Sequence, residues 1–223
     1  MIKKKKNPKK RINKFKIPDW TTEKSLWSQG FKLVVGIDEV GRGAWAGPVV
    51  AGAVIFAEGT EIVGVRDSKQ MNEYDRECLA MEIKSRAFLY AIGEASSEEV
   101  DEKGILVATK LAMERSLNLL GVKPDFLLID ALRLVWQGVA CQPIIKGDQK
   151  SISIASGSIV AKVYRDELMK KYDKKYRNYC FAEHKGYGTK KHQEMIEKYG
   201  LCDIHRSSFK CFRKKSKGLF DAK

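Results

Sequence analysis

Four carboxylates stand at or just after short apolar stretches of this 223-residue chain, and they are the side chains best suited to chemistry. Asp38 ends the stretch FKLVVGID and Glu39 follows it, Asp130 ends FLLID, and Asp148 comes shortly after an apolar II pair. Sites in open α/β sheets gather at the carboxyl ends of strands. These positions therefore predict that the acids converge on one place. For Asp130 and Asp148 a plainer alternative stays open, because acids are also common in ordinary turns.

Asp38 and Glu39 are adjacent, and adjacent residues of a regular strand point to opposite faces of its sheet. The two side chains can therefore share a site only where the strand is breaking. Gly41 and Gly43 follow directly and indicate a break at this point.

Clustered carboxylates repel one another unless positive charge lies between them. Oxygen-only ligands favour hard cations, so Mg²⁺ or Mn²⁺ is the expected filler. Two such ions, roughly 3.5–4 Å apart, can clamp the attacking and leaving oxygens of a phosphodiester displacement. One ion generates hydroxide from water, and the other stabilises the departing 3′ oxygen. The predicted chemistry is metal-dependent phosphodiester hydrolysis.

The strands that would carry these acids are predicted from apolar runs bounded by turn residues. Residues 31–38 and 48–57 form two buried strands around a glycine-rich turn, 126–130 forms a short one, and 142–146 is a further candidate. Residues 88–95 either end a helix or form a strand, and the small residues in this stretch favour the strand. Two adjacent strands before any helix, followed by alternation, predict a mixed α/β sheet with an antiparallel pair.

Four helices are predicted from apolar spacing and from end signals. One follows Asn72, a capping box of Ser96 and Glu99 opens the second, the third runs from 151 to about 176, and a short fourth covers 190–199. Their predicted inward faces comprise Tyr74, Cys78, Met81 and Phe88; Ile105, Ala108, Ala112 and Leu119; and Ile152, Ala155, Ile159 and Val163. Gly157 costs the third helix roughly 1 kcal/mol relative to Ala, so we expect close packing on the sheet to require it.

Several motifs, in order along the chain, match those of a known family. The first is GIDEVGRGAWAGPVVAGAV at 36–54, followed by Asp67-Ser68-Lys69 and by LLID ending at Asp130. The series continues with KGDQKSISIASGSIVAKVYRD at 146–166, FAEHKGYGT at 181–189 and YGLCDIHRSSF at 199–209. Together they resemble the ribonuclease HII family over nearly all of residues 32–209.

The resemblance implies an RNase H-like fold, with helices flanking the mixed sheet and a helical segment at the C-terminal end. It also implies a metal-dependent endonuclease that hydrolyses the RNA strand of RNA–DNA hybrids and takes part in ribonucleotide excision repair. Such an enzyme cuts 5′ to ribonucleotides embedded in duplex DNA and leaves 3′-OH and 5′-phosphate ends. Carried over by position, Asp38, Glu39, Asp130 and Asp148 are the catalytic acids and the ligands of two divalent ions.

The same resemblance assigns Gly41, Arg42, Gly43 and Tyr187 to recognition of the ribonucleotide junction. Telling RNA from DNA at one nucleotide requires sensing of the 2′-OH, which both donates and accepts hydrogen bonds. Glycines let backbone groups approach it, and Tyr187 could set its ring against the neighbouring deoxyribose. We expect Lys69 and Arg42 to contact phosphates. The alternatives are that Tyr187 is a core or hinge residue, that Lys69 is a solvated loop charge, and that Arg42 pairs with a nearby acid.

The chain departs from the family pattern at four positions. Ala131 stands where glycine is common, Gly157 where alanine is typical, Trp45 where a smaller or apolar residue is usual, and Asp203 where proline is frequent. None of these changes removes a catalytic group, although Trp45 and Ala131 could alter substrate fit or rate. No long folded module is expected before the catalytic body, which argues against the related type III enzymes.

Positive charge is concentrated at the two ends of the chain. The net charge of +14 divides into +9 over residues 1–16 and +5 over 209–223, so the body is neutral. We expect 1–16 to be a disordered basic arm, 17–209 the catalytic domain and 210–223 a basic tail. Such ends raise the affinity for any polyanion, and salt weakens this effect. The alternative is that the arm only keeps the protein soluble.

Composition narrows the class of protein. No apolar run approaches membrane-spanning length, and the basic N-terminus lacks the apolar stretch of a secretory signal. Five scattered cysteines favour a reducing cytosol. We therefore expect a cytoplasmic monomer without membrane contact, and we assign no protein partner.

Two further groups of residues are expected to be structural. The intervals of Cys180 with His184 and of Cys202 with His205 are too irregular for a zinc site. Asp166 is a fifth acid near the motifs, but it lies inside a predicted helix, where it is expected to pair with Arg165 or Lys162 or to cap a neighbouring loop.

Two other functions compete with this hypothesis. One is a basic nucleic-acid-binding protein without catalysis, and the other is an RNase H-like nuclease that acts on DNA junctions. A pure binder has no reason to place four acids facing phosphates, because each acid repels the ligand unless a metal intervenes. The glycine loop and Tyr187 argue against the junction nuclease, because they fit sensing of a 2′-OH.

Overall fold

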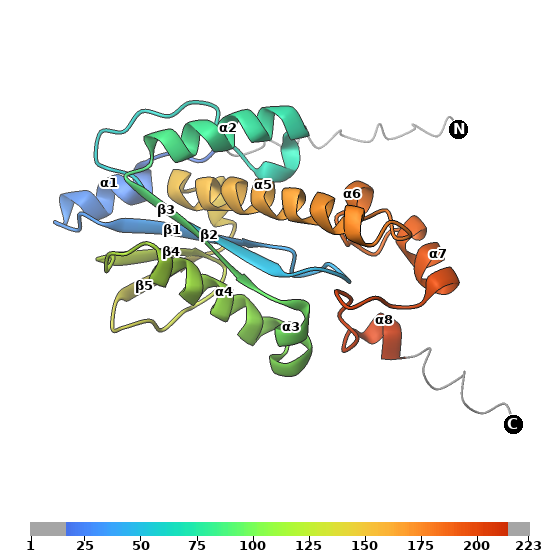
Figure 1. Cartoon of the computed structure of the whole chain (residues 1–223). Helices are drawn as coiled ribbons and strands as arrows, with labels where there is room; N and C mark the ends of the chain where they lie inside the picture. Colours follow the sequence, from blue (N-terminus) through green and yellow to red (C-terminus); the bar gives the residue numbers. More distant parts are fainter. Residues whose placement is uncertain (1–16, 214–223) are drawn as a thin grey trace, which may run out of the picture.

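A computed structural model describes residues 17–213 of the chain, and these form one five-stranded mixed sheet between two layers of helices (Figure 1). The predicted basic arm at 1–16 and all but the start of the predicted basic tail at 210–223 lie outside the described residues. The strands are β1 Val34–Val40, β2 Val49–Ile55, β3 Leu89–Ala95, β4 Phe126–Asp130 and β5 Ala140–Ile144, in the order β3-β2-β1-β4-β5. β2 pairs antiparallel with β1 and β3, whereas β4 pairs parallel with β1 and β5. The mixed sheet with an antiparallel pair, predicted from the sequence, is confirmed.

The helices divide between the two faces of the sheet. The elements α1 Thr21–Ser28, α2 Glu73–Arg86 and α5 Ile152–Lys175 cover one face, while α3 Ser97–Lys103 and α4 Ile105–Leu119 cover the other (Figure 1). The predicted C-terminal helical segment comprises α6 Phe181–His184, α7 Lys190–Tyr199 and α8 Lys210–Arg213. None of the helices in the described part is long and apolar enough to cross a membrane.

Three glycines bring α5 directly onto the sheet. A Cβ added at Gly36 of β1 would lie 2.1 Å from the Ser153 carbonyl carbon, and one at Gly52 of β2 would lie 2.3 Å from the Gly157 oxygen. A Cβ at Gly157 would in turn lie 2.7 Å from the Gly52 oxygen and 3.3 Å from the Asp38 nitrogen. Such contacts are too short for real side chains, so the predicted need for glycine within this helix is confirmed. The first half of α5 is therefore fixed against the strand that carries Asp38.

Two predicted helix faces are wrong in part. In α2 the buried residues are Arg76, Leu79, Ala80 and Ile83, whereas the predicted Tyr74 and Met81 are 73% and 65% exposed. The predicted and the observed residues both have helical spacing. Leu79, Ala80 and Ile83 are the ones that pack against α5. The predicted second helix divides at Gly104 into α3 and α4, and Leu119 at its end is 67% exposed.

The first helix, α1, was not predicted from the sequence, because distant residues hold it in place. α1 precedes β1, so two strands do not come before any helix as predicted. The buried Glu23 Oε1 accepts hydrogen bonds from the Ser151 hydroxyl at 2.7 Å and from the Ser153 nitrogen at 2.9 Å. A carboxylate at the N-terminus of α5 is favourable because the first N–H groups of a helix lack partners. α1 is thus held by residues more than 120 positions away in the chain.

Candidate active site

The sequence predicted that the strand breaks at Asp38 and Glu39. This prediction is wrong, because both residues lie within β1. Asp38 pairs with Gly52 and Glu39 with Ala51 on β2, whereas pairing with β4 ends one residue earlier at Ile37. Burial raises the pKa of Asp38 well above its usual range, and the neighbouring Glu39 and Asp130 add to this effect. Although β1 continues through both acids, Asp130 lies close enough to raise the pKa of Asp38 and of Glu39.

Asp130 is the last residue of β4, and Asp148 is the middle residue of a short 3₁₀ turn, Gly147–Gln149. Asp130 Oδ1 accepts a hydrogen bond from the Gly147 nitrogen at 2.7 Å, which ties the two segments together. Burial raises the pKa of Asp148, and the negative charges of Asp130 and Asp67 raise it further. The structure thus brings all four predicted acids into one electrostatic neighbourhood, rather than leaving Asp130 and Asp148 in unrelated turns.

Lys69 lies among these carboxylates. It belongs to the 3₁₀ turn Ser68–Gln70, which Asp67 caps by accepting a hydrogen bond from the Lys69 nitrogen at 3.0 Å. Burial disfavours the charged Lys69, but the fields of Asp148, Asp67, Asp38 and Asp130 outweigh it and raise the pKa of the ammonium. Asp67 is a fifth acid of this neighbourhood, which the motif Asp67-Ser68-Lys69 already contained but which the sequence analysis did not select as a site residue.

Arg42 and Glu39 form an ion pair at the edge of the site. Arg42 Nη1 lies 2.9 Å from Glu39 Oε1, so Arg42 does pair with a nearby acid; a guanidinium has five N–H donors, so this pair does not exclude a phosphate contact as well. The other oxygen, Glu39 Oε2, is buried and has no hydrogen-bond partner among the described residues. Burial raises the pKa of Glu39, Arg42 opposes this shift, and Asp130 adds to it. A buried carboxylate oxygen without a partner suits a cation ligand.

A cavity of about 480 Å³ adjoins these residues. Its lining combines the predicted recognition residues with side chains from α5 and from the Ser68–Gln70 turn: Glu39, Val40, Gly41, Arg42, Ser68, Lys69, Ser158, Lys162 and Tyr187. Gly41 has a φ of +95°, and a Cβ there would lie 2.3 Å from Arg165 Nε, so packing requires glycine. A Cβ at Gly43 would meet no atom within 4 Å, so the space beside it is open.

Tyr187 is half-buried in the cavity wall and rests on a buried arginine. The Arg165 guanidinium lies 5.4 Å from the centre of the Tyr187 ring. Arg165 also donates to three main-chain oxygens, those of Pro48 at 3.0 Å, Ala46 at 3.0 Å and Lys185 at 2.8 Å. The segment around Tyr187 and the segment after Gly43 are therefore held by one side chain. Tyr187 is half-buried and is therefore not a core residue.

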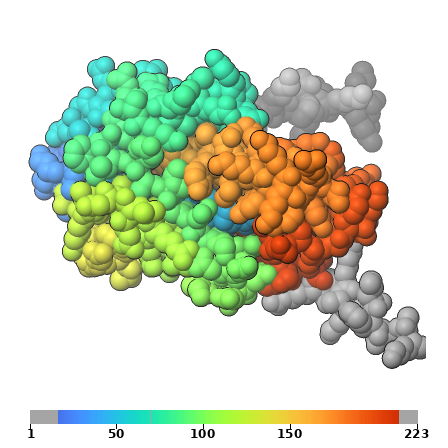
Figure 2. Space-filling view, in the orientation of Figure 1, coloured from blue at the N-terminus to red at the C-terminus, as the bar shows by residue number. Residues whose placement is uncertain are grey.

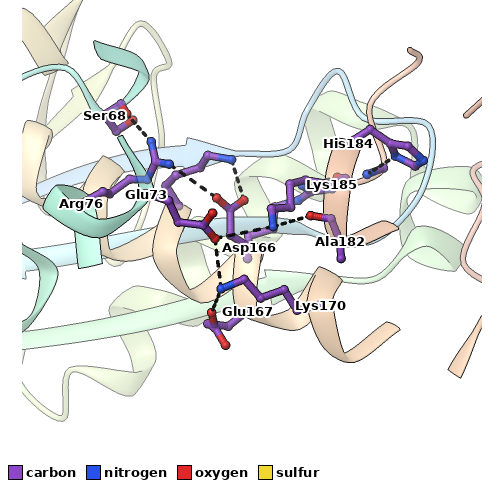
Figure 3. Close-up of polar contacts among 12 residues, drawn as sticks. Ser68, Glu73, Arg76, Asp166, Glu167, Lys170, Ala182, His184 and Lys185 are labelled. Atoms are coloured by element: carbon purple, nitrogen blue, oxygen red, sulfur yellow. Dashed lines mark hydrogen bonds and ion pairs between the residues drawn. The ribbon is translucent and has the colours of Figure 1, made fainter. Parts of the chain in front are cut away.

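A polar network between α2 and α5 supports the wall that carries Lys69 (Figure 3). Arg76 donates to the Ser68 oxygen at 2.6 Å and lies 4.0 Å from Asp166, which in turn binds Lys162 at 2.6 Å. The predicted pairing of Asp166 with Lys162 is confirmed. Burial lowers the pKa of Lys162, and Asp166 opposes this shift. On the outer side, Glu73 binds Lys170 and Lys185, which links α2 to the segment before Tyr187 (Figure 3).

No three His, Cys, Asp or Glu side chains within residues 17–213 are gathered into a ready-made metal site. Neither Cys180, His184, Cys202 and His205 nor the acids form such a group of three. Asp130 is close enough to Asp38, Glu39 and Asp148 to raise the pKa of each of these three, and Glu39 retains a buried oxygen without a partner among the described residues. The donor set, all carboxylate oxygens, fits a hard divalent cation.

Comparisons with known proteins agree on one family. The family described as Ribonuclease HII matches residues 35–212. Ribonuclease HII of Clostridioides difficile is 50% identical over 187 residues, which cover 84% of this chain and 73% of that protein. Ribonuclease HII of Listeria monocytogenes is 49% identical over 200 residues, covering 90% and 76%. The crystal structure of ribonuclease H2 from Pyrococcus horikoshii superposes with a TM-score of 0.67 at 28% identity, covering 82% of this chain and 97% of that one.

Proposed function

The chain belongs to the ribonuclease HII family and is a ribonuclease H, and from this premise we propose that it cuts 5′ to single ribonucleotides embedded in duplex DNA as well as within RNA–DNA hybrids. It leaves 3′-OH and 5′-phosphate ends and acts as a cytoplasmic monomer in ribonucleotide excision repair. One observation carries the proposal: Asp130 lies close enough to Asp38, Glu39 and Asp148 to raise their pKa values, and these acids adjoin a cavity lined by Gly41, Arg42 and Tyr187.

We infer that two divalent ions, Mg²⁺ or Mn²⁺, are held by the carboxylates of Asp38, Glu39, Asp130 and Asp148. When bound, such ions activate water and stabilise the departing 3′ oxygen. The partnerless Glu39 Oε2 and the raised pKa of Asp38 support this, because a cation would relieve both burial and mutual repulsion. Arg42 holds the other Glu39 oxygen and so fixes the direction of that carboxylate.

The recognition residues of the chain have separate tasks in this proposal. The open space beside Gly43 admits a ribose so closely that backbone groups can bond its 2′-OH. Tyr187, set in the cavity wall on Arg165, sets its ring against the deoxyribose on the other side of the junction. Lys69 and Arg42 line the same cavity and contact the phosphates, which positions the strand without reading its sequence.

The two rival functions differ from this proposal in what they require of the acids. A non-catalytic binder would be weakened by buried carboxylates facing phosphates, and it would keep its affinity when the acids are replaced by amides. A junction nuclease would need no open space at Gly43 and would cut all-DNA substrates.

The test uses two labelled duplexes, one all DNA and one with a single ribonucleotide, each with Mg²⁺, with Mn²⁺ and with EDTA. We expect a metal-dependent cut directly 5′ to the ribonucleotide, no cut in plain DNA, and no cut by Asp130→Asn. Glu58→Gln is the matched control, because Glu58 is an exposed acid whose salt bridge to Lys32 is 3.9 Å long and solvated. Binding without cutting under every metal condition would overturn the proposal in favour of the binder.

A further inference from the structure

The three histidines of the chain lie together, outside the group of carboxylates. His184 and His192 stack with ring centres 4.3 Å apart, and the rings of His192 and His205 are 5.2 Å apart. His192 is completely buried, and His184 and His205 are nearly so. The family function described above uses none of them.

The hydrogen-bond partners assign a neutral tautomer to His205 and to His192. His205 Nδ1 accepts from the Cys202 nitrogen at 2.8 Å, so its proton is on Nε2. His205 Nε2 lies 3.1 Å from His192 Nε2 and donates to it. His192 therefore carries its proton on Nδ1, which donates to the Tyr187 oxygen at 3.0 Å. The chain of donors runs in one direction, from the backbone at Cys202 to the backbone at Tyr187.

At one end, this histidine relay, defined as His205 and His192, fixes the main chain of Tyr187. The Tyr187 oxygen also accepts from the Thr189 nitrogen at 2.8 Å, and the Tyr187 nitrogen donates to the His184 oxygen at 2.9 Å. Those two hydrogen bonds are local to the turn. His192 belongs to α7, so its hydrogen bond ties the Tyr187 main chain to another element. The direction of the Tyr187 side chain follows from this held backbone.

At the other end, the relay is joined to the loop that follows Gly43. The Gly47 nitrogen donates to the Ile204 oxygen at 2.8 Å, and the Arg206 nitrogen donates to the Trp45 oxygen at 2.8 Å. The completely buried Arg206 donates through Nη1 to the Arg42 oxygen at 3.0 Å. Residues 202–206 therefore hold the Gly41–Gly43 loop and, through the relay, also Tyr187.

Asp101 anchors this C-terminal segment to the rest of the protein. Its two carboxylate oxygens accept from the nitrogens and hydroxyls of Ser207 and Ser208 at 2.6–3.1 Å. In the space-filling view, the red C-terminal segment accordingly lies against the green middle of the chain (Figure 2). The relay thus starts from a segment that is fixed to α3 and not from a free end.

We propose that His192 and His205 are positioning residues for discrimination at the ribonucleotide junction, because they set Tyr187 in register with the Gly41–Gly43 loop. This inference rests on the proposed function, in which Tyr187 contacts the deoxyribose. The hydrogen-bond partners of the relay are Cys202 and Tyr187 and not the four carboxylates, so we expect its loss to affect substrates that depend on Tyr187 and to spare the hydrolytic step itself.

The experiment compares kcat/KM for a single embedded ribonucleotide with kcat/KM for an all-RNA strand on DNA. His192→Leu removes the donor to Tyr187, and we expect it to lower the ratio of the two values about tenfold. His192→Asn places an amide N–H where Nδ1 lies and should restore most of the ratio. His205→Gln keeps a donor to His192 and should behave like wild type, whereas His205→Leu should lower the ratio.

Two controls separate a positioning role from general damage. Leu117→Ala destabilises the core on the opposite face of the sheet and should leave the ratio unchanged. In a Tyr187→Ala background, His192→Leu should change the ratio less than twofold, because the group through which it acts is gone. If His192→Leu lowers the ratio as much in the Tyr187→Ala background as in wild type, the proposed relay is wrong. It is also wrong if His192→Leu alone leaves the ratio unchanged. If the wild-type chain does not cut at the single ribonucleotide, the proposed function fails instead.

Discussion

The buried histidines predict a specific loss of stability in mild acid. Burial lowers the pKa of His192 to about 4, and the neighbouring His184 contributes; burial likewise lowers the pKa of His205 to about 4. An unfolded histidine takes up its proton near pH 6.5. Between pH 6.5 and 4 the unfolded chain therefore binds protons that the folded chain excludes, and the free energy of unfolding falls as the pH falls.

The size of the effect follows from these pKa values. For one histidine, the linkage relation gives a loss of about 2 kcal/mol between pH 7 and pH 5, with most of the change below pH 6.5. The raised pKa values of Asp38, Glu39 and Asp148 have the opposite effect. The folded chain binds these protons more tightly than the unfolded chain, so they raise the free energy of unfolding as the pH falls. The wild-type curve alone mixes both effects, so the informative quantity is the difference between wild type and a variant without one histidine.

The assay is urea unfolding followed by tryptophan fluorescence at pH 7 and pH 5. The variant is His205→Gln, which keeps a donor toward His192 but does not titrate. We expect wild type to lose about 2 kcal/mol more than this variant between the two pH values, or roughly 4–8 °C in melting temperature. Equal losses within about 0.5 kcal/mol would show that His205 is not held neutral in the fold, and would refute the tautomer assignment with it.

Other predictions concern the acids, the backbone and the substrate. Asp38→Asn should abolish cleavage yet raise the free energy of unfolding by about 1 kcal/mol, because a buried and repelled carboxylate is removed; melting curves without added metal check this. Ala131 has a φ of 52°, so Ala131→Gly should stabilise the fold by up to about 1 kcal/mol in urea titrations, and a loss would contradict it. Gly157→Ala should cost about 1 kcal/mol net, since contacts of 2.7–3.3 Å to three main-chain atoms outweigh the gain in helix propensity; a rise in melting temperature would show that α5 can move away from the sheet. Lys69→Ala should weaken binding of the ribonucleotide duplex in EDTA and reduce the slope of log K against log salt by about 1, as measured by fluorescence anisotropy, while an unchanged slope would remove Lys69 from the phosphate contacts.

Local signals in the sequence predicted the elements that carry the acids. The capping box of Ser96 and Glu99 is present with both of its hydrogen bonds, and the strand that ends at Asp130 has the predicted bounds. Such features depend on residues within a few positions of one another. The buried face of α2 could not be chosen in this way. Tyr74 and Met81 share one helix face, and Leu79 and Ile83 share another, so the choice between these two faces depends on the distant residues that pack against α2.

The site could be predicted only as far as its chemistry is carried by side-chain type. Asp38, Glu39, Asp130 and Asp148 stand out as acids at strand ends, but the residues that hold the recognition elements do not. Arg165 and Arg206 donate to main-chain oxygens of the loop after Gly41, and every residue type offers such an oxygen. The sequence therefore cannot predict to which main-chain oxygens a buried arginine donates.

If His192 and His205 position Tyr187 as proposed, specificity at the junction depends on the C-terminal segment. Burial lowers the pKa of Arg206 to about 9, so the fold keeps a guanidinium in a place where its charge is unfavourable. Truncating Arg206 would leave the buried oxygens of Arg42 and Gly47 without these donors and would free the loop that contains Gly43. Replacing His192 would remove the donor to the Tyr187 oxygen and the acceptor of the His205 N–H, but it would leave the hydrogen bonds of Arg206 to the loop in place. Damage at Arg206 should therefore impair every substrate, whereas damage at His192 should impair the junction alone.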